Sequence, residues 1–497
     1  MAGTRGSPRG PKVIVCGAGP AGLTAAYELT KNEAAVQVLE ADPLYVGGIS
    51  RTVQHRGYRF DIGGHRFFSK SAEIEQLWDE LLGDQLLRRD RLSRIFYHGK
   101  FYHYPIRVAN AMWNLGPIEA FLCGLSYVRA RLHPAPRPTT FEQWVTNQFG
   151  ARLFRTFFKT YTEKVWGIST NELSADWAAQ RIRGLSFSTL IANSLPRIKG
   201  SRARDTPKTL IDHFRYPRFG PGQCWETVAD RLRTAGHPVA MGERVVAIAR
   251  RDVSTMQVVS RSEAGELSTW TGNAVISTIP LRDLVNCLLP KPPGEILEAA
   301  DSLHYRDFLT VGVIVARPQL FADNWIYIHD PGVRVGRIQN FKNWSPDMSP
   351  DSTYTHLGLE YFCFEGDELW ASEDQALVAL ARRELETLGL CRAEEVIDGV
   401  VIRCPKAYPV YDSHYADHVR TVRTWLREHY PGLWCVGRNG MHKYNNQDHS
   451  MMTALLAARA IVGVSSVDPW CVNSDAEYHE AATSNSVTER AAPVPLG

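Results

Sequence analysis

Short apolar runs alternate with helical stretches at the start of the chain. Residues 12–17 contain four consecutive apolar positions, as expected for a strand that is buried on both faces. A helical stretch over residues 23–29 follows, and residues 36–40 form a second predicted strand. The pattern therefore predicts one strand–helix–strand unit at the N-terminal end.

Further along, the periodicity changes several times. Residues 71–82 have one apolar face and are predicted to form an amphipathic helix, and residues 94–104 alternate around His98 and Gly99 as a hairpin does. From Thr139 the pattern is helical to about residue 195, starting with a capping box of Thr139 and Glu142. The other expected elements are a helix over residues 225–235, strands within 239–280, 308–315, 325–329 and 354–364, and an α/β portion over 377–463.

The composition is that of an ordinary globular protein. Of the 497 residues, 44% are hydrophobic and 22% are charged, which excludes an overall disordered, collagen-like or coiled-coil chain. The formal net charge of +3 is too small to indicate nucleic-acid binding. The nine cysteines form no CxxC pair, so neither a disulfide framework nor a metal site is expected. Because no long uncharged apolar run and no apolar leader occur, we expect a cytoplasmic protein without a membrane span.

A glycine-rich turn joins the first predicted strand to the first helix. Gly17 makes the tight turn, Gly19 lets the backbone approach a pyrophosphate, and Gly22 allows the helix to pack closely on the strand. Ala21 lies at the start of the helix, whose N-terminus attracts negative charge. Glu40, 18 residues after Gly22, ends the second strand and is placed to accept hydrogen bonds from ribose hydroxyls. Together these features predict a dinucleotide site.

Two later features favour FAD over NAD as the dinucleotide. Gly47 and Gly48, followed by Arg51, offer a second close approach of the backbone, which the flavin half of FAD requires. Near the end of the chain, Gly437 and Arg438 follow a predicted strand that would return to the first sheet. Such a late strand is expected where a substrate domain is inserted into the dinucleotide fold. Two segments fit the remaining strand edges around the adenine and the pyrophosphate, namely residues 243–246, with Val245, and residues 277–280.

Several further motifs are characteristic of one family. They are Asp61-x-Gly63-Gly64-His65-x-x-Phe68-Ser69, Tyr102-His103-Tyr104-Pro105, Glu163-Lys164-Val165-Trp166-Gly167 with Trp177 and Arg181, Trp325-x-Tyr327, the block from Arg337 to Trp344, and Asn446-Gln447-Asp448-His449-Ser450. With these motifs the chain resembles the UDP-galactopyranose mutases, especially the eukaryotic branch, within the amine oxidase and protoporphyrinogen oxidase-like superfamily of FAD proteins. The similarity extends over residues 12–463.

The resemblance implies a reaction on a nucleotide-diphosphate sugar. In that family N5 of reduced FAD attacks the anomeric carbon, and the sugar ring opens and recloses, which interconverts pyranose and furanose. NAD(P)H serves only to reduce the flavin, so turnover is redox-neutral. By the same resemblance the enzyme binds a small-molecule substrate and can form a homodimer.

Site residues are implied position by position. Arg181 and Arg337 would hold the diphosphate, Tyr327 and Tyr408 would donate hydrogen bonds to it, and His65 would lie by the flavin. The other implied substrate contacts are Phe68, Tyr104, Arg107, Trp166 and Trp344. The other implied flavin contacts are Gly63, Gly64, Arg438, Asn446, Gln447, Asp448 and Ser450.

The pattern and the resemblance together predict an α/β fold with three parts. These are a discontinuous Rossmann-like FAD-binding domain of the GR2 type, an inserted helical domain and a mainly antiparallel sheet domain. The expected ranges are 11–93, 215–290 and 425–465 for the FAD-binding domain, 106–214 for the helical substrate domain, and 94–105 with 291–424 for the sheet domain. Residues 466–497 lack periodicity and are expected to be a disordered tail.

The chain departs from the mutase pattern near the substrate. Trp344 stands where the eukaryotic mutases have tyrosine, Arg107 replaces a glutamine, Lys70 a histidine and Arg66 a small apolar residue. These changes leave the sugar and the base open. They also leave open a second function, an FAD-dependent oxidoreductase that acts on a sugar, an amine or another metabolite. A third alternative is a flavin-bearing binding protein without turnover, and Trp166 and the tyrosines could instead be packing residues.

Overall fold

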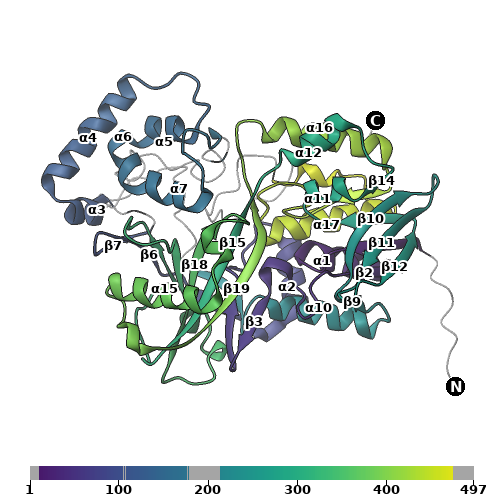
Figure 1. Ribbon diagram of the computed structural model, residues 1–497, viewed down its shortest axis with the longest axis horizontal. Helices are drawn as coiled ribbons and strands as arrows, with labels where there is room; N and C mark the ends of the chain where they lie inside the picture. The colour runs from purple at the N-terminus through teal and green to yellow at the C-terminus, as the bar shows by residue number, and fades with distance from the viewer. Residues whose placement is uncertain (1–9, 105, 107, 176, 178–212, 474–497) are drawn as a thin grey trace, which may run out of the picture.

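A five-stranded parallel sheet lies at the centre of the dinucleotide-binding part of the molecule (Figure 1). The computed structural model describes residues 10–104, 106, 108–175, 177 and 213–473. In space the sheet has the order β20-β13-β1-β2-β9, with every neighbouring pair parallel. Its strands are β1 (Lys12–Cys16), β2 (Ala35–Leu39), β9 (Val239–Ala240), β13 (Ala274–Ser277) and β20 (Leu433–Cys435). Because distant segments pair in one sheet, the predicted discontinuous α/β fold is confirmed.

Four helices pack against this sheet and against each other. They are α1 (Pro20–Lys31), α2 (Ala72–Leu82), α10 (Gly222–Thr234) and α17 (Gln447–Ile461). Ser71 caps α2 by accepting a hydrogen bond from the backbone N–H of Ile74, and Gly83 follows its last residue. Leu23, Trp78, Trp225 and Met451 are fully buried where the helices meet the strands. The start of the chain thus folds into the predicted strand–helix–strand unit.

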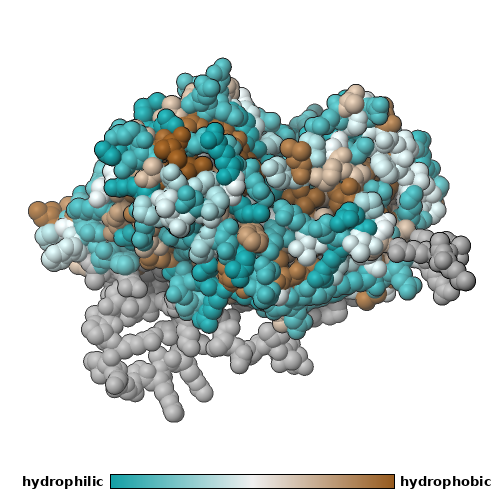
Figure 2. Space-filling view, turned by 90° about the horizontal axis from the view of Figure 1, so that it is seen from below, coloured by the Kyte–Doolittle hydropathy of each residue, from teal (hydrophilic) through white to brown (hydrophobic). Residues whose placement is uncertain are grey.

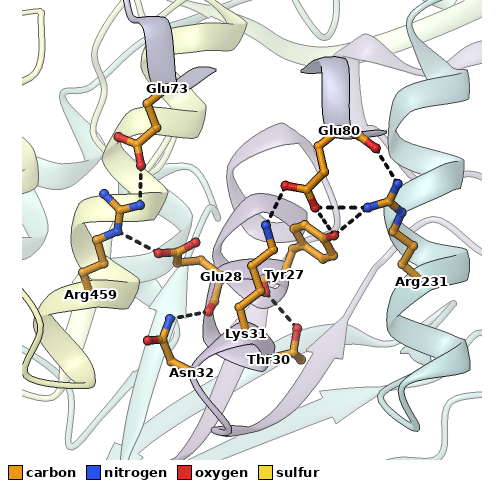
Figure 3. A network of polar contacts seen from close by, with 9 residues as sticks. All are labelled: Tyr27, Glu28, Thr30, Lys31, Asn32, Glu73, Glu80, Arg231 and Arg459. Atoms are coloured by element: carbon orange, nitrogen blue, oxygen red, sulfur yellow. Dashed lines mark hydrogen bonds and ion pairs between the residues drawn. The ribbon is translucent and has the colours of Figure 1, made fainter. Parts of the chain in front are cut away.

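A polar network joins the outer surfaces of these helices (Figure 3). Glu80 of α2 accepts a hydrogen bond from the Tyr27 hydroxyl at 2.5 Å, and Arg231 of α10 donates to the same hydroxyl at 2.6 Å. Arg459 of α17 donates to Glu28 of α1 at 2.7 Å. The network links four helices that come from three distant segments of the chain. It therefore holds the discontinuous domain together.

A second, mainly antiparallel layer flanks the parallel sheet. It has the order β12-β11-β10-β14. Its strands are β10 (Arg244–Arg250), β11 (Met256–Arg261), β12 (Leu267–Gly272) and the short β14 (Leu288–Leu289). Neighbouring elements are α11 (Leu281–Asn286), α12 (Gly294–Asp301) and α16 (Tyr415–His429). They enclose a core that includes Ile248, Val258, Leu284 and Val422.

A seven-stranded mixed sheet forms the other large layer. Its order is β19-β15-β18-β17-β16-β6-β7, with only β16 and β6 paired in parallel. Every residue of β15 and β18 is buried. The bounds are β6 (Ser93–Tyr97), β7 (Lys100–His103), β15 (Tyr305–Val315), β16 (Trp325–Ile328), β17 (Arg337–Asn340), β18 (Thr355–Cys363) and β19 (Val396–Pro409). The sequence pattern does not single out β19, because partly exposed positions interrupt its apolar residues.

Smaller elements complete this part of the molecule. α13 (Phe341–Trp344) and α14 (Glu368–Ala371) are short, and α15 (Asp374–Thr387) packs on β15 and β19. Two ribbons are formed by β3 (Thr52–His55) with β4 (Tyr58–Asp61), and by β5 (Leu86–Asp90) with β8 (His213–Pro217).

A group of helices projects from the mixed sheet (Figure 1). It contains α3 (Val108–Leu115), α4 (Pro117–Leu132), α5 (Phe141–Phe149), α6 (Ala151–Leu153) and α7 (Thr160–Trp166), with a π-helical segment at Phe154–Lys159. The predicted capping box at Thr139 is wrong by one residue. Thr140 is the cap, because its side chain accepts a hydrogen bond from the backbone N–H of Gln143 at 3.3 Å. Residues 176 and 178–195 of the predicted helical stretch and the tail from 474 lie outside the described residues. The disordered tail predicted from residue 466 is wrong for residues 466–473, because a 3₁₀ turn forms at Pro469–Cys471 and Trp470 packs against the core that includes Ile248.

Two expectations from composition can be compared with the structure. All nine cysteines are described, and none of them is in a disulfide. Across the described residues, every helix is too short or too polar to cross a membrane.

Candidate active site

A cavity of about 490 Å³ opens at the carboxyl ends of the parallel strands. Ligands of open α/β sheets bind at this edge. Most residues predicted to bind the cofactor line it: Gly17, Gly19, Ala21, Glu40, Gly48, His65, Val245, Gly437, Arg438, Gln447 and Ser450. The chain thus brings residues that are more than 400 positions apart to one site.

The glycine-rich turn has the geometry that its sequence predicts. Gly17 has φ of +104°, and a Cβ there would lie 2.0 Å from Oγ1 of Thr278. A Cβ on Gly22 would lie 1.8 Å from the carbonyl oxygen of Gly17, so α1 can pack closely only with glycine there. Gly19 begins α1 without a side-chain cap, and Pro20 is its first residue. The N-terminus of α1 is therefore open to an anion in the cavity.

Glu40 lies at the end of β2, on the cavity wall. Its carboxylate accepts hydrogen bonds from the backbone N–H of Ala18 at 2.6 Å and from that of Asp42 at 2.9 Å. Burial raises the pKa of Glu40, while these two backbone N–H groups act in the opposite direction. Each carboxylate oxygen has a further lone pair, so Glu40 can also accept hydrogen bonds from a ribose.

His65 lies between the cavity and the mixed sheet. Its Nε2 lies 2.8 Å from the carbonyl oxygen of Ile62, and its Nδ1 lies 3.3 Å from the hydroxyl of Ser50. Burial lowers the pKa of His65 to about 4, and the charges of Arg438 and Arg337 add to the shift. At neutral pH the ring is thus uncharged, so Nε2–H donates to Ile62 and Nδ1 is left as an acceptor.

Arg337 begins β17 and is fixed by a buried carboxylate. Glu360 of β18, which is fully buried, accepts from Nε of Arg337 at 2.5 Å and from the amide of Gln339 at 2.7 Å. Burial alone would lower the pKa of Arg337, but Glu360 and nearby tyrosines raise it well above its ordinary value. A Cβ on Gly63 would lie 3.6 Å from NH2 of Arg337. The charged guanidinium therefore lies directly against the turn that carries His65.

Tyr161, Tyr327 and Tyr408 lie close to this guanidinium, and Tyr104 and Tyr444 pack against Tyr327 and Tyr408; we call these five residues the tyrosine cluster. The ring centroids of Tyr104 and Tyr327 are 4.9 Å apart, and those of Tyr408 and Tyr444 are 5.8 Å apart with nearly parallel planes. The Arg438 guanidinium lies 4.7 Å from the centroid of Tyr444. Burial raises the pKa of Tyr161 well above its usual value and also raises that of Tyr408, so both hydroxyls stay protonated and can donate.

Two of the predicted substrate contacts are packing residues in the structure. Trp344 is 1% exposed, and its Nε1–H donates to the carbonyl oxygen of Asn324 at 2.9 Å. A Cβ on Gly64 would lie 3.3 Å from its ring, so Trp344 packs directly against the turn that carries His65. Trp166 is 3% exposed and packs edge-on against Trp177 at 4.5 Å. Both side chains are thus almost completely enclosed by protein groups, as the alternative of a packing role expects for Trp166, and their contact with a substrate stays a prediction.

Other predicted residues lie near the cavity or outside the described part. The cofactor predictions Gly22, Gly47, Arg51, Gly63, Gly64, Asn446 and Asp448 are not part of the cavity lining. Arg51 donates to the carbonyl oxygen of Gly48 at 3.2 Å, and Asp448 accepts from the Ser69 hydroxyl at 3.0 Å. Phe68 is partly buried against the sheet core. Arg107 and Arg181 lie outside the described residues.

Some residues of the site were not predicted from the sequence. Glu360 carries a recognisable signal, because it is the one carboxylate inside the apolar run of β18. Ser50, Asn439 and Asn445 line the cavity without a motif that marks them. Tyr161 lies in a stretch rich in aromatic residues, where nothing separates it from the packing residues.

Comparison with protein families identifies the group to which this fold and site belong. The family model described as flavin containing amine oxidoreductase matches residues 20–434, which is most of the chain. The chain belongs to this family. It is therefore a flavin-dependent enzyme of the amine oxidoreductase family.

Several solved structures share the fold of this chain. A reduced UDP-galactopyranose mutase is 23% identical, with a TM-score of 0.78 over 93% of this chain and 99% of its own. A protein described as a putative protoporphyrinogen oxidase from Exiguobacterium sp. 255-15 is 18% identical, with a TM-score of 0.67 over 91% of this chain and 98% of its own. A putrescine oxidase variant is 17% identical, with a TM-score of 0.61 over 92% and 99%.

The cavity of this flavin-dependent enzyme fits FAD. The uncapped N-terminus of α1 would face the pyrophosphate and Glu40 the ribose, as in other dinucleotide sites. Nε2 of Gln447 and Oδ1 of Asn439 are buried at the cavity without a protein partner. Buried polar groups need a partner, so these two atoms indicate a polar ligand. Among the described residues, no three histidine, cysteine, aspartate or glutamate side chains lie together in a way that could hold a metal ion.

Proposed function

We propose that the enzyme interconverts the pyranose and furanose forms of a nucleotide-diphosphate sugar, without net oxidation. Arg337 carries this proposal. Its guanidinium is held by Glu360 next to the His65 turn, close to Tyr161, Tyr327 and Tyr408 of the tyrosine cluster. A charged fork with protonated hydroxyls around it suits a diphosphate, on which negative charge develops as the leaving group departs.

The charge of the site argues against a cationic substrate. Arg438 donates to the carbonyl oxygens of Asn445 and Ala407, and no carboxylate of the described residues forms an ion pair with it. Its charge remains on the cavity side of the tyrosine cluster. A protonated amine would be repelled there, whereas an anion would be attracted. The likeness to the UDP-galactopyranose mutase structure supports the same interpretation.

Each group of the chain has a defined task in this proposal. Bound in its reduced form, FAD supplies the nucleophile for the anomeric carbon. Arg337 holds and orients the diphosphate, and Tyr327 and Tyr408 donate hydrogen bonds to it. Neutral His65 fixes the turn beneath the substrate through its bond to Ile62. The partly buried rings of the tyrosine cluster would help to exclude water from the reacting sugar.

Binding to the holoenzyme tests the proposed substrate class. We expect UDP or GDP to raise the melting temperature of the holoenzyme, while putrescine leaves it unchanged. Arg337→Lys keeps a charge beside Glu360 but loses the planar fork, and Arg337→Ala loses both. Arg337→Ala should cost roughly 2–5 kcal/mol of nucleotide binding, and Arg337→Lys less. Stabilisation by the diamine and none by either nucleotide would favour an oxidase of the amine type.

A further inference from the structure

Residues 465–473, which follow α17, fold back onto the molecule; we call them the C-terminal strap. They contain the 3₁₀ turn at Pro469–Cys471. Elsewhere, hydrophobic residues reach the surface in several patches on the face that Figure 2 shows. In the strap, by contrast, Pro469 is buried and Trp470 packs against the core that includes Ile248. The strap is thus a docked part of the fold, unlike the loose ends of many chains.

α16 holds the strap at its middle. Arg423 of this helix donates to the carboxylate of Asp468 at 2.5 Å, and its guanidinium lies 4.8 Å from the ring centroid of Trp470. Asp468 also accepts a hydrogen bond from the backbone N–H of Trp470 at 2.9 Å, which closes the turn. Residues 471–473 therefore leave the turn from a fixed point.

The end of the strap is bonded to the loop between β20 and α17. The ammonium of Lys443 donates to the carbonyl oxygen of Trp470 at 3.2 Å. The side-chain amide of Asn473 donates to the carbonyl oxygen of Tyr444 at 3.2 Å and to Oδ1 of Asn445 at 3.1 Å. The strap thus contacts three consecutive residues of this loop.

The backbone of Asn473 is adapted to these two bonds. Its φ of +56° lies in the left-handed region, which residues other than glycine seldom enter. Asparagine tolerates this region better than most residues, and its amide can donate two hydrogen bonds. His442, in the loop that Asn473 contacts, also has a positive φ, of +45°. Such conformations persist where the surrounding structure enforces them, and they cluster at functional sites.

Asn445 links the strap to the cofactor cavity, which it lines. It is 1% exposed, and its Nδ2 donates to the carbonyl oxygen of Gly437 at 3.0 Å. Its own carbonyl oxygen accepts from Nε of Arg438 at 2.9 Å. If the Asn445 amide were rotated by half a turn, its Nδ2 would face the donor of Asn473 and its Oδ1 would face the Gly437 oxygen. Asn473 therefore fixes the one orientation of Asn445 that holds the Gly437 turn.

Tyr444 links the strap to the tyrosine cluster. Its backbone N–H donates to the hydroxyl of Tyr411 at 2.7 Å, and its carbonyl oxygen accepts from Asn473. The backbone of Tyr444 is thus held on both sides. Its ring lies against the guanidinium of Arg438 and, nearly parallel, against the ring of Tyr408.

We propose that Asn473 is a positioning residue of the active site. Through Asn445 it sets the place of Arg438 at the cofactor cavity, and through Tyr444 it sets the ring on which Tyr408 lies. The second part rests on the function proposed above, in which Tyr408 donates to the diphosphate. The first part depends only on the cofactor cavity.

Two variants of the full-length holoenzyme remove the amide of Asn473. Asn473→Asp keeps the size of the side chain but cannot donate, and Asn473→Gly keeps the left-handed backbone without a side chain. Because each variant loses two hydrogen bonds, we expect FAD release after dilution, followed by flavin fluorescence, to be about 10-fold faster. The visible absorption band of the bound flavin should shift, because Arg438 changes place.

Asn32→Asp is the matched control. Asn32 also donates its side-chain amide to a carbonyl oxygen, that of Glu28 at 2.9 Å, but it follows the last residue of α1, at the end remote from the cavity. It should change neither FAD release nor the flavin band. Wild-type release with an unshifted band in both Asn473 variants would overturn the proposal. Faster release with an unshifted band would also overturn it, because that result indicates a general loss of stability.

Nucleotide binding tests the link to the tyrosine cluster separately. In holoenzyme kept saturated with FAD, Asn473→Asp should raise the Kd for UDP several-fold. An unchanged Kd would overturn the proposed effect on Tyr408. If the wild type itself binds no UDP, the proposed function fails, whereas FAD release and the flavin band still decide the role of Asn473 at the cavity.

Discussion

Arg337 and Glu360 form a buried ion pair, on which substrate binding depends in the function that we propose. The Glu360 carboxylate is fully buried and the Arg337 guanidinium is only partly exposed. Water therefore cannot fully solvate either charge if its partner is removed. A buried charge that loses its partner is costly, whereas the intact pair mainly fixes geometry. We therefore interpret Glu360 as a positioning residue that keeps the fork of Arg337 aimed at the substrate.

Glu360→Gln should weaken nucleotide binding without removing the guanidinium. The neutral amide cannot compensate the charge of Arg337, so the side chain is expected to lose its fixed orientation. We expect the Kd for UDP to rise about 10–100-fold and the free energy of unfolding to fall by roughly 3 kcal/mol. Calorimetric titration of the holoenzyme measures the first. Glu365→Gln, which removes an exposed carboxylate that pairs with Lys406, should change neither, and an unaltered Kd in Glu360→Gln would refute the assigned role.

His65 gives a pH-dependent contribution to stability. Its folded pKa of about 4 lies below the ordinary value of 6.5, so the unfolded chain binds more protons between these two values. Stability contributed by neutral His65 is therefore present above pH 6.5 and is lost as the pH falls toward 4, by up to about 1.4 kcal/mol per pH unit. Urea unfolding of wild type and His65→Asn at pH 7.5, 6 and 5 should show a difference that shrinks with falling pH. A difference that is constant over this range would contradict the assignment.

Lys164 connects the helical part to the loop that precedes β17. At the end of α7, its ammonium donates to the carbonyl oxygens of Ile328, Asp330 and Val335, at 3.0 to 3.3 Å. These three bonds fix the segment between β16 and β17, and hence the start of the strand that carries Arg337. The family-like motif around Lys164 is thus a connection between two elements, with no direct contact to the cavity.

Lys164→Met should leave three carbonyl groups without a donor. We expect KM for the sugar nucleotide to rise several-fold, with a loss of roughly 2–3 kcal/mol in unfolding free energy. Steady-state kinetics and urea unfolding provide the two readouts. The control is Lys291→Met, because Lys291 is exposed and donates to a single carbonyl, that of Asn286. If KM were equal in both variants, the loop would not depend on Lys164.

The elements differ in how well the sequence predicts them. β1 and α1 follow directly from an apolar run and a glycine turn, because both signals are local. The register of β18 beside β17, which pairs Arg337 with Glu360, comes from contacts between distant segments. Local periodicity contains no information on such pairing. For the same reason Glu360 and Tyr161 join the site only once the sheet and α7 are assembled.

Across the whole molecule, the sequence motifs predict the residues that line the cofactor cavity more reliably than the residues that would contact the substrate. Glycines that approach a ligand leave a strict pattern, so Gly17, Gly19 and Gly437 could be placed from spacing alone. Aromatic residues leave no such pattern in the sequence, because a tryptophan in the core cannot be told from a tryptophan at a ligand. Trp344 shows this, since the resemblance implies a substrate contact for it while the structure gives it a buried hydrogen bond to the carbonyl oxygen of Asn324.

The balance of electrons during turnover decides between a mutase and an oxidoreductase. Holoenzyme reduced with dithionite and kept anaerobic should be incubated with UDP-galactofuranose and a panel of GDP-sugars, with products separated by chromatography. We predict many equivalents of the ring isomer per flavin, with no reductant consumed and no acceptor reduced. Absence of a ring isomer from every nucleotide sugar, together with steady reduction of oxygen or another acceptor in step with product, would contradict the proposed function.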